Sequence, residues 1–133
     1  AGIGYGTMRA QQAYRGWRSA RTGCGGIRQI AGRDPINAKY AGRRHPSGVR
    51  FTKQGFPDFR PYARAQVRIR GLTGNYAKDA AMANRAVGLN RTPDGYVWHH
   101  VEDGLTMQLV PQPLHNGVPH TGGAALIRQR GSI

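Results

Sequence analysis

The sequence predicts an α+β fold whose C-terminal half is a hairpin of two short strands followed by a helix. The run YVWHH at residues 96–100 has the length and aromatic content of a strand. It is flanked by two turn sequences, TPDG before it and EDG after it. A second apolar run, LTMQLV at residues 105–110, predicts the partner strand. Pro111 ends this strand, and Pro113 suits the first turn of a helix.

The residues before the hairpin predict one more strand and one more helix. Val67 to Ile69 alternate apolar side chains with an arginine, which is the pattern of a half-buried strand. Residues 75–87, NYAKDAAMANRAV, have the spacing of a helix, with Thr73 as the expected N-cap and Gly88 at the C′ position. Because the chain has 20 Gly and 8 Pro, we expect loops around these elements and a modest core.

The length of 133 residues fits one domain, which we place at residues 38–133. Residues 1–37 are rich in glycine and arginine and carry no acidic residue before Asp34. We expect them to be a basic linker or arm, in which residues 8–19 can form a short helix. A linker would tie the domain to a larger protein, whereas an arm would follow a nucleic-acid backbone or bind an inhibitor.

The charge of the chain predicts a polyanionic partner. Lys and Arg number 20 against 6 Asp and Glu, so the formal charge is +14, and nucleic acid, an anionic membrane and an acidic protein are the candidates. Insertion into a membrane is excluded because no apolar stretch approaches the roughly 18 residues of a span. We expect four arginines around the predicted strand to contact phosphate, the last three on one face of it: Arg60, Arg64, Arg68 and Arg70.

Four of the five histidines lie close together near the C-terminus. His99 and His100 are adjacent in the first hairpin strand, so their side chains should point to opposite faces. His115 and His120 are five residues apart, and a slightly irregular helical turn would bring both rings to one side. A single cysteine excludes a thiolate zinc cluster, so histidine is the ligand type to consider.

This histidine cluster predicts metal chemistry. Three neutral imidazoles suit zinc or another transition metal, with one position left open for substrate, and a fourth histidine suits a general base. Together with the charge, the cluster predicts a metal-dependent nuclease. The alternative from another class is a basic nucleic-acid-binding protein whose histidines hold a structural zinc.

These residues carry a resemblance to a known family. Trp98-His99-His100, the run MQLVP at residues 107–111, and His115 followed by HTGG at residues 120–123 resemble the WHH branch of the HNH/endonuclease VII superfamily. The resemblance covers about residues 38–127. It implies a ββα-metal core surrounded by loops and at least one additional helix.

The resemblance also implies a role for each histidine. His99, His115 and His120 would be metal ligands, and His100 would be the general base that activates water. The distal spacing, with four residues between His115 and His120, is one residue longer than in colicin-type nucleases. Binding of phosphate by His120 is therefore the alternative to ligation.

Other side chains of the hairpin receive supporting roles. Gln108 or Asn116 would replace the central Asn of HNH nucleases in fixing the base, and Trp98 would pack the hairpin against the core. Glu102 and Asp103 lie in the EDG turn, where solvated carboxylates are expected and ligands or partners of an imidazole are the alternative.

The function implied is an endonuclease that hydrolyses DNA with little sequence specificity, an RNase with the same site being the alternative. The cofactor would be one divalent ion, with Zn or Ni favoured by affinity and Mg or Mn able to serve as the catalytic ion. Such domains act as antibacterial toxin effectors. They are tethered to larger secreted toxins, delivered into the cytoplasm of a target bacterium and neutralised by an immunity protein, which we expect to be acidic.

Overall fold

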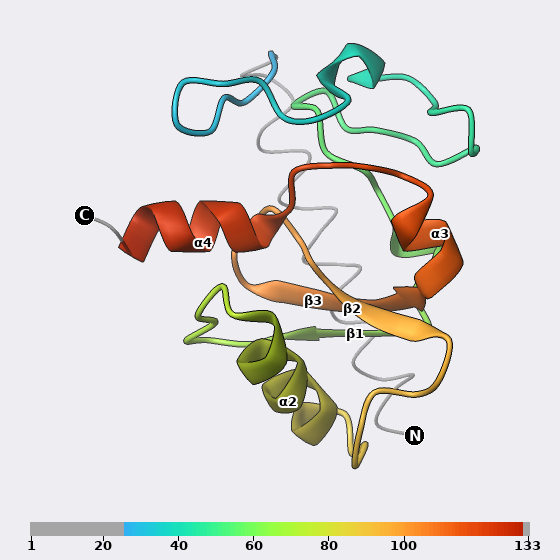
Figure 1. The fold of residues 1–133 in the computed structure, drawn as a ribbon, viewed down its shortest axis with the longest axis vertical. Helices are drawn as coiled ribbons and strands as arrows, with labels where there is room; N and C mark the ends of the chain where they lie inside the picture. The colour runs from blue at the N-terminus through green and yellow to red at the C-terminus, as the bar shows by residue number, and fades with distance from the viewer. Residues whose placement is uncertain (1–25, 132–133) are drawn as a thin grey trace.

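The computed structural model describes residues 26–131 of the chain, so the helix expected at residues 8–19 and most of the basic arm lie outside the described residues. The main elements in chain order are strand β1, helix α2, strands β2 and β3, and helices α3 and α4 (Figure 1). Two short 3-10 turns, η1 and η2, precede them. Their bounds are η1 Ala38–Tyr40, η2 Arg60–Tyr62, β1 Ala65–Arg68, α2 Tyr76–Ala86, β2 Tyr96–His100, β3 Thr106–Pro111, α3 Gln112–Asn116 and α4 Gly123–Gly131.

The three strands form one antiparallel sheet in the order β1-β3-β2, which confirms the α+β fold and the predicted hairpin. Residues that face each other across the ladders share a face of the sheet. One row across the sheet therefore consists of Gln66, Gln108 and His99, and the neighbouring row of Ala65, Leu109 and Trp98 lies on the other face.

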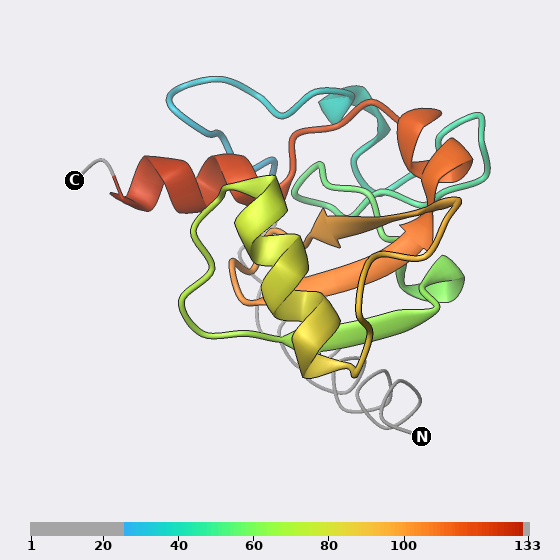
Figure 2. The same ribbon diagram turned by 60° about the horizontal axis from the view of Figure 1, so that its bottom comes forward.

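Helix α2 covers the face that carries Trp98 (Figures 1 and 2). Ala80 and Ala83 of this helix are buried in one apolar cluster with Trp98, Leu109 and Ile127, the last from α4. Small side chains on the helix let it lie close to the sheet. This cluster is the larger part of the core.

Loops and helix α3 cover the opposite face of the sheet. Val49, Phe51 and Phe59 of the loops before β1 form a second apolar cluster with Val110 of β3 and Val118. The expectation of a modest core wrapped by loops is thus met by two small clusters, one on each side of a three-stranded sheet.

The start of α2 differs from the prediction. Asn75, not Thr73, is the N-cap, and its side chain accepts the Lys78 N–H at 3.0 Å. The Thr73 hydroxyl instead donates to Asp79. Gly88 follows the helix with φ of 79°, the left-handed conformation that the C′ position needs. Among the described residues, no helix is long and apolar enough to span a membrane.

Candidate functional site

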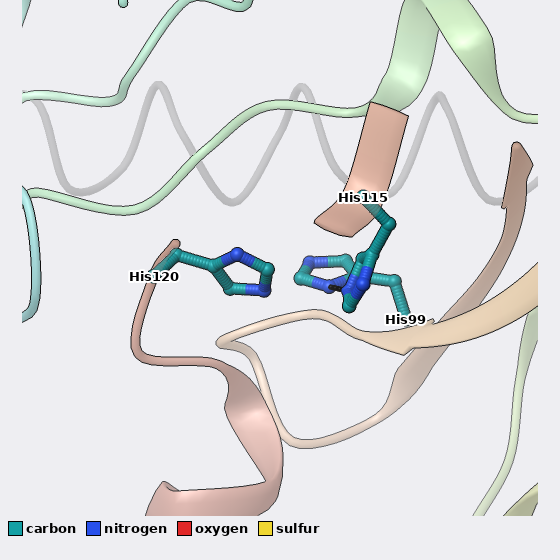
Figure 3. A group of neighbouring side chains, drawn as sticks. All are labelled: His99, His115 and His120. Atoms are coloured by element: carbon teal, nitrogen blue, oxygen red, sulfur yellow. Dashed lines mark hydrogen bonds between the residues drawn. The ribbon is translucent and has the colours of Figure 1, made fainter. Parts of the chain in front are cut away.

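Three histidines from three separate segments meet on the loop-covered face of the sheet (Figure 3). His99 comes from β2, His115 from α3, and His120 from the segment between α3 and α4. Each offers a ring nitrogen, and these atoms all lie within 4.8 Å of one another. His99 Nδ1 and His115 Nε2 are 3.2 Å apart.

Hydrogen bonds to the residues on both sides of His120 hold it in this cluster. The Ile36 N–H donates to the Thr121 hydroxyl at 2.9 Å, and the Asn37 amide donates to the Pro119 carbonyl at 2.6 Å. Residues 36 and 37, which the sequence assigns to the arm, therefore position the segment that carries the third histidine. A Cβ at Gly123 would collide with the Val101 carbonyl, so the close approach of this segment to the hairpin needs glycine there.

Phe59 forms an apolar wall against the three imidazoles. It is fully buried, and its ring centroid lies 4.8, 5.5 and 5.6 Å from those of His99, His115 and His120. The ring keeps water from that side of the cluster, and it lowers the local polarity in which any charge would have to form.

Burial keeps all three rings neutral. It is the main reason that the pKa of His99 lies well below its usual value, and the neighbouring His120 and His115 add to the effect. Burial also lowers the pKa of His115, to about 4. It lowers the pKa of His120 as well, although the hydrogen bond to the Val118 carbonyl acts in the opposite direction. Near pH 7 the three nitrogens therefore compete little with protons for a metal.

The cluster fits one divalent ion. Two imidazole nitrogens bound to a tetrahedral zinc at about 2.05 Å lie about 3.3 Å apart, close to the 3.2 Å between His99 and His115. His120 Nδ1 lies 2.6 Å from the Val118 carbonyl, which can only accept a proton, so the lone pair is on Nε2 and available to a metal. Of the described acidic residues, none belongs to the cluster.

His100 lies across the sheet from the cluster. Because it alternates with His99, its side chain is on the α2 face, as the sequence predicts for adjacent histidines in a strand. Its Nε2 is 2.7 Å from Asp79 Oδ2, and both side chains are buried.

Asp79, on helix α2, is the partner of His100 that sequence reasoning missed. It also accepts hydrogen bonds from the Thr73 N–H and hydroxyl and from the Gly74 N–H. Burial raises the pKa of this carboxyl, but the hydrogen bonds from His100, Thr73 and Gly74 together bring it below 3.8. Its signal in the sequence is slight, namely a single acid among the small residues of a predicted helix.

The residues expected to hold His100 lie elsewhere. Gln108 is on the face of His99, and its amide donates to the Gln66 side chain at 2.6 Å. Asn116 lies beside His115, and its hydrogen bond acts against the lowering of the His115 pKa by burial. The expectation that one of these two fixes the base is therefore replaced by the observed contact with Asp79.

The remaining hairpin residues divide between core and turn. Trp98 is buried, as expected, and its Nε1–H donates to the Asn84 side chain at 2.8 Å. Glu102 is buried, which contradicts the expectation of a solvated carboxylate. Asp103 accepts the Leu105 N–H and the Thr106 hydroxyl, so it stabilises the turn itself.

The four arginines expected to contact phosphate occupy different settings. Arg60 is largely buried in a two-point ion pair with Asp58, at 3.0 and 2.8 Å. Arg64 is exposed beside the Tyr96 ring. Arg68 and Arg70 are also exposed, but β1 ends at Arg68. Arg70 therefore lies outside the strand, and the expected stripe of three on one strand face is not formed.

Comparison with known proteins agrees with this geometry. Residues 89–130 match a family described as a nuclease of the HNH/ENDO VII superfamily with conserved WHH. No curated protein matches the chain. The matched residues contain the whole β2–β3 hairpin and the three clustered histidines. Residues 89–130 are therefore similar to the WHH nucleases of the HNH/ENDO VII superfamily, and this similarity supports a metal-dependent nuclease.

Proposed function

We propose that this protein is a metal-dependent endonuclease that hydrolyses DNA with little sequence specificity. The observation that carries the proposal is the cluster of three neutral imidazoles inside the matched segment of a strongly basic chain. A formal charge of +14 favours binding to the phosphate backbone, which carries no sequence information.

In this proposal His99, His115 and His120 hold one divalent ion. The ion would stabilise negative charge on the phosphoryl and leaving oxygens of the scissile phosphodiester. The Val118 carbonyl fixes the tautomer of His120, and Phe59 shields the three rings from water. Among the described residues the cluster supplies three ligands, and a site with three protein ligands leaves room for substrate, which favours a catalytic site over a structural zinc with four ligands.

We assign the role of general base to His100. The Asp79 carboxylate only accepts hydrogen bonds, so a His100 ring that carries a single proton has it on Nε2 and its lone pair on Nδ1. Because this ring is buried on the α2 face, the proposal requires the attacking water to reach Nδ1 at the end of β2, where the strand ends at His100. Nδ1 would then take a proton from that water, and Asp79 would stabilise the imidazolium that results. The proton then remains on His100 until it is returned to solvent.

The biological setting proposed is that of an antibacterial effector. The domain would belong to a larger secreted toxin, act in the cytoplasm of a target bacterium and be held inactive by an acidic immunity protein. The charge supports this partner, because association of a +14 chain with an acidic protein is fast and electrostatically steered.

Incubation with plasmid DNA and with total RNA, each with EDTA or with Mg, Mn, Zn or Ni, tests the function. We expect nicking and linearisation of the plasmid that EDTA abolishes. Cleavage of RNA alone would establish an RNase with the same site. Absence of cleavage of both substrates with every metal would favour the nucleic-acid-binding protein with a structural zinc.

Two variants test the roles of the adjacent histidines. His100→Ala should retain metal but lose plasmid cleavage, whereas His99→Ala should lose metal content in elemental analysis. Cleavage at the wild-type rate by His100→Ala would remove this residue from the mechanism. Unchanged metal content in His99→Ala would remove it from the ligand set.

A further inference from the structure

A cationic cavity of about 410 Å³ lies outside the histidine cluster. It is formed by the loop before η2 and by η2 itself. Its volume is within the range of pockets that bind small ligands. The lining residues are Arg44, Arg50, Asp58, Arg60, Pro61 and Tyr62.

The backbone of this loop sets two arginines side by side. Arg44 and Arg50 face each other in an antiparallel bridge, and the chain between them turns at Gly48, which has a φ of 95°. The Arg44 guanidinium donates to the Gly48 carbonyl at 2.9 Å, which restricts its orientation. Both arginines are exposed. Two cations are thus held near each other by backbone pairing.

The cavity retains positive charge after its internal ion pair is counted. Arg60 is paired with Asp58, which also accepts the Arg60 N–H at 3.1 Å, so this guanidinium is fixed in place. Arg44 and Arg50 make no ion pair with another described residue. Planar guanidinium groups in this arrangement suit the oxygens of a phosphate.

The cavity is next to the histidine cluster along the chain. Asp58, Arg60 and Tyr62 line the cavity, while Phe59, between the first two, packs on all three histidine rings. The cavity and the histidine cluster therefore share one segment of the chain, residues 58–60.

We propose that this cavity binds one nucleotide of the substrate strand beside the scissile phosphate, an inference that rests on the proposed function. Arg44 and Arg50 contact its phosphate, and the base lies against Tyr62, which is 37% exposed. The aromatic ring favours a nucleotide over an acidic protein surface, because every base offers a face for stacking whereas a carboxylate gains nothing from it. An unpaired base is the form that can stack, so the site selects single-stranded or locally opened substrate.

Binding of a labelled single strand of about 20 nucleotides tests the site. Fluorescence anisotropy in EDTA, where cleavage does not occur, compares wild type with Arg44→Ala/Arg50→Ala. Two lost phosphate contacts should lower the slope of log K against log salt by about 1.4, so the affinity gap to wild type narrows about sevenfold between 50 and 200 mM KCl. Tyr62→Ala should weaken binding by about 5- to 150-fold without changing the slope, and Tyr62→Phe should bind like wild type.

Arg85→Ala/Arg91→Ala is the matched control, since it removes the same charge from exposed positions far along the chain from the cavity. We expect less than a threefold loss of affinity in this variant. If the cavity variant matched the control in affinity and slope, or if wild type bound no strand, the nucleotide site would be refuted. Plasmid cleavage by wild type with no effect of the cavity variant on binding would refute the site but not the nuclease. A changed salt slope in the cavity variant, together with no plasmid cleavage by wild type, would support the nucleotide site and refute the nuclease.

Discussion

Asp79→Asn separates the proposed catalytic role of Asp79 from its role in folding. Its Oδ1 accepts the Thr73 N–H and hydroxyl at 2.9 and 2.8 Å, and Oδ2 accepts the Gly74 N–H at 2.8 Å and His100 Nε2–H at 2.7 Å. An asparagine that keeps its oxygen toward Thr73 places its NH₂ group against two donors. His100 avoids the conflict only by moving its proton to Nδ1, which removes the lone pair assigned to the base.

The turnover number of Asp79→Asn should therefore fall by about 10²- to 10⁴-fold, the usual contribution of a general base. Metal content and nucleic-acid affinity should stay at wild-type values, because the three clustered histidines lie on the other face of the sheet. The buried contact with the Gly74 N–H should cost about 1–3 kcal/mol in the free energy of unfolding. Single-turnover plasmid nicking, elemental analysis and urea unfolding measure the three quantities.

Asp103→Asn is the control for this prediction. Asp103 accepts the N–H groups of Leu105 and Thr106 and the Thr106 hydroxyl, much as Asp79 accepts those of Thr73 and Gly74, but it contacts no histidine among the described residues. The control should lose comparable stability and keep its turnover number within about twofold. If Asp79→Asn nicked plasmid at the wild-type rate, Asp79 would have no part in holding the base.

Three further predictions concern the cluster and the core. Burial lowers the pKa of His115 from 6.5 to about 4, so between these pH values the unfolded chain binds more protons than the folded chain. The free energy of unfolding of the metal-free protein should therefore decrease as pH falls from about 6.5 to about 4. A free energy from urea unfolding that does not change with pH in this range would contradict burial of the neutral ring. The methyl group of Gly123→Ala would meet the Val101 carbonyl, so this variant should lower the free energy of unfolding by about 1–3 kcal/mol and lower the metal content. If neither value changed, the segment at Gly123 would be able to move away from Val101. Trp98→Phe leaves the Asn84 oxygen without its indole donor and should cost about 1–3 kcal/mol in urea unfolding at unchanged metal content; a metal loss would tie Trp98 to the cluster directly.

Local patterns allowed the hairpin to be predicted from the sequence. YVWHH forms β2 with the predicted bounds, and the opposite directions of His99 and His100 follow from the two-residue period of a strand. The clustering of His99, His115 and His120 was accessible for a similar reason, since a hairpin and the turn after it leave the chain few ways to place three nearby rings.

Contacts between distant segments were beyond this reasoning. Asp79 meets His100 only because α2 packs on one face of the sheet, and its position 21 residues earlier carries no periodic signal. The pairing of Arg44 with Arg50, and of residue 36 with Thr121, likewise depends on how loops fold over the opposite face. Burial of Glu102 was not predicted because an EDG turn resembles a solvated turn, whereas Gly123, the first residue of α4, lies against the backbone of Val101 and Glu102.

The tryptophan that precedes the two histidines has a physical role in sorting them. Trp98 occupies the α2 face, where its indole N–H donates to Asn84, so a one-residue slip of β2 would turn this large ring out of the core. With Trp98 fixed, His99 must face the histidine cluster and His100 must face Asp79. The sheet then separates the proposed base from the proposed ligands, so the base is not lost to the metal as a fourth imidazole. A WHH triplet thus specifies the register of the strand and places the proposed ligand and the proposed base on opposite faces of the sheet.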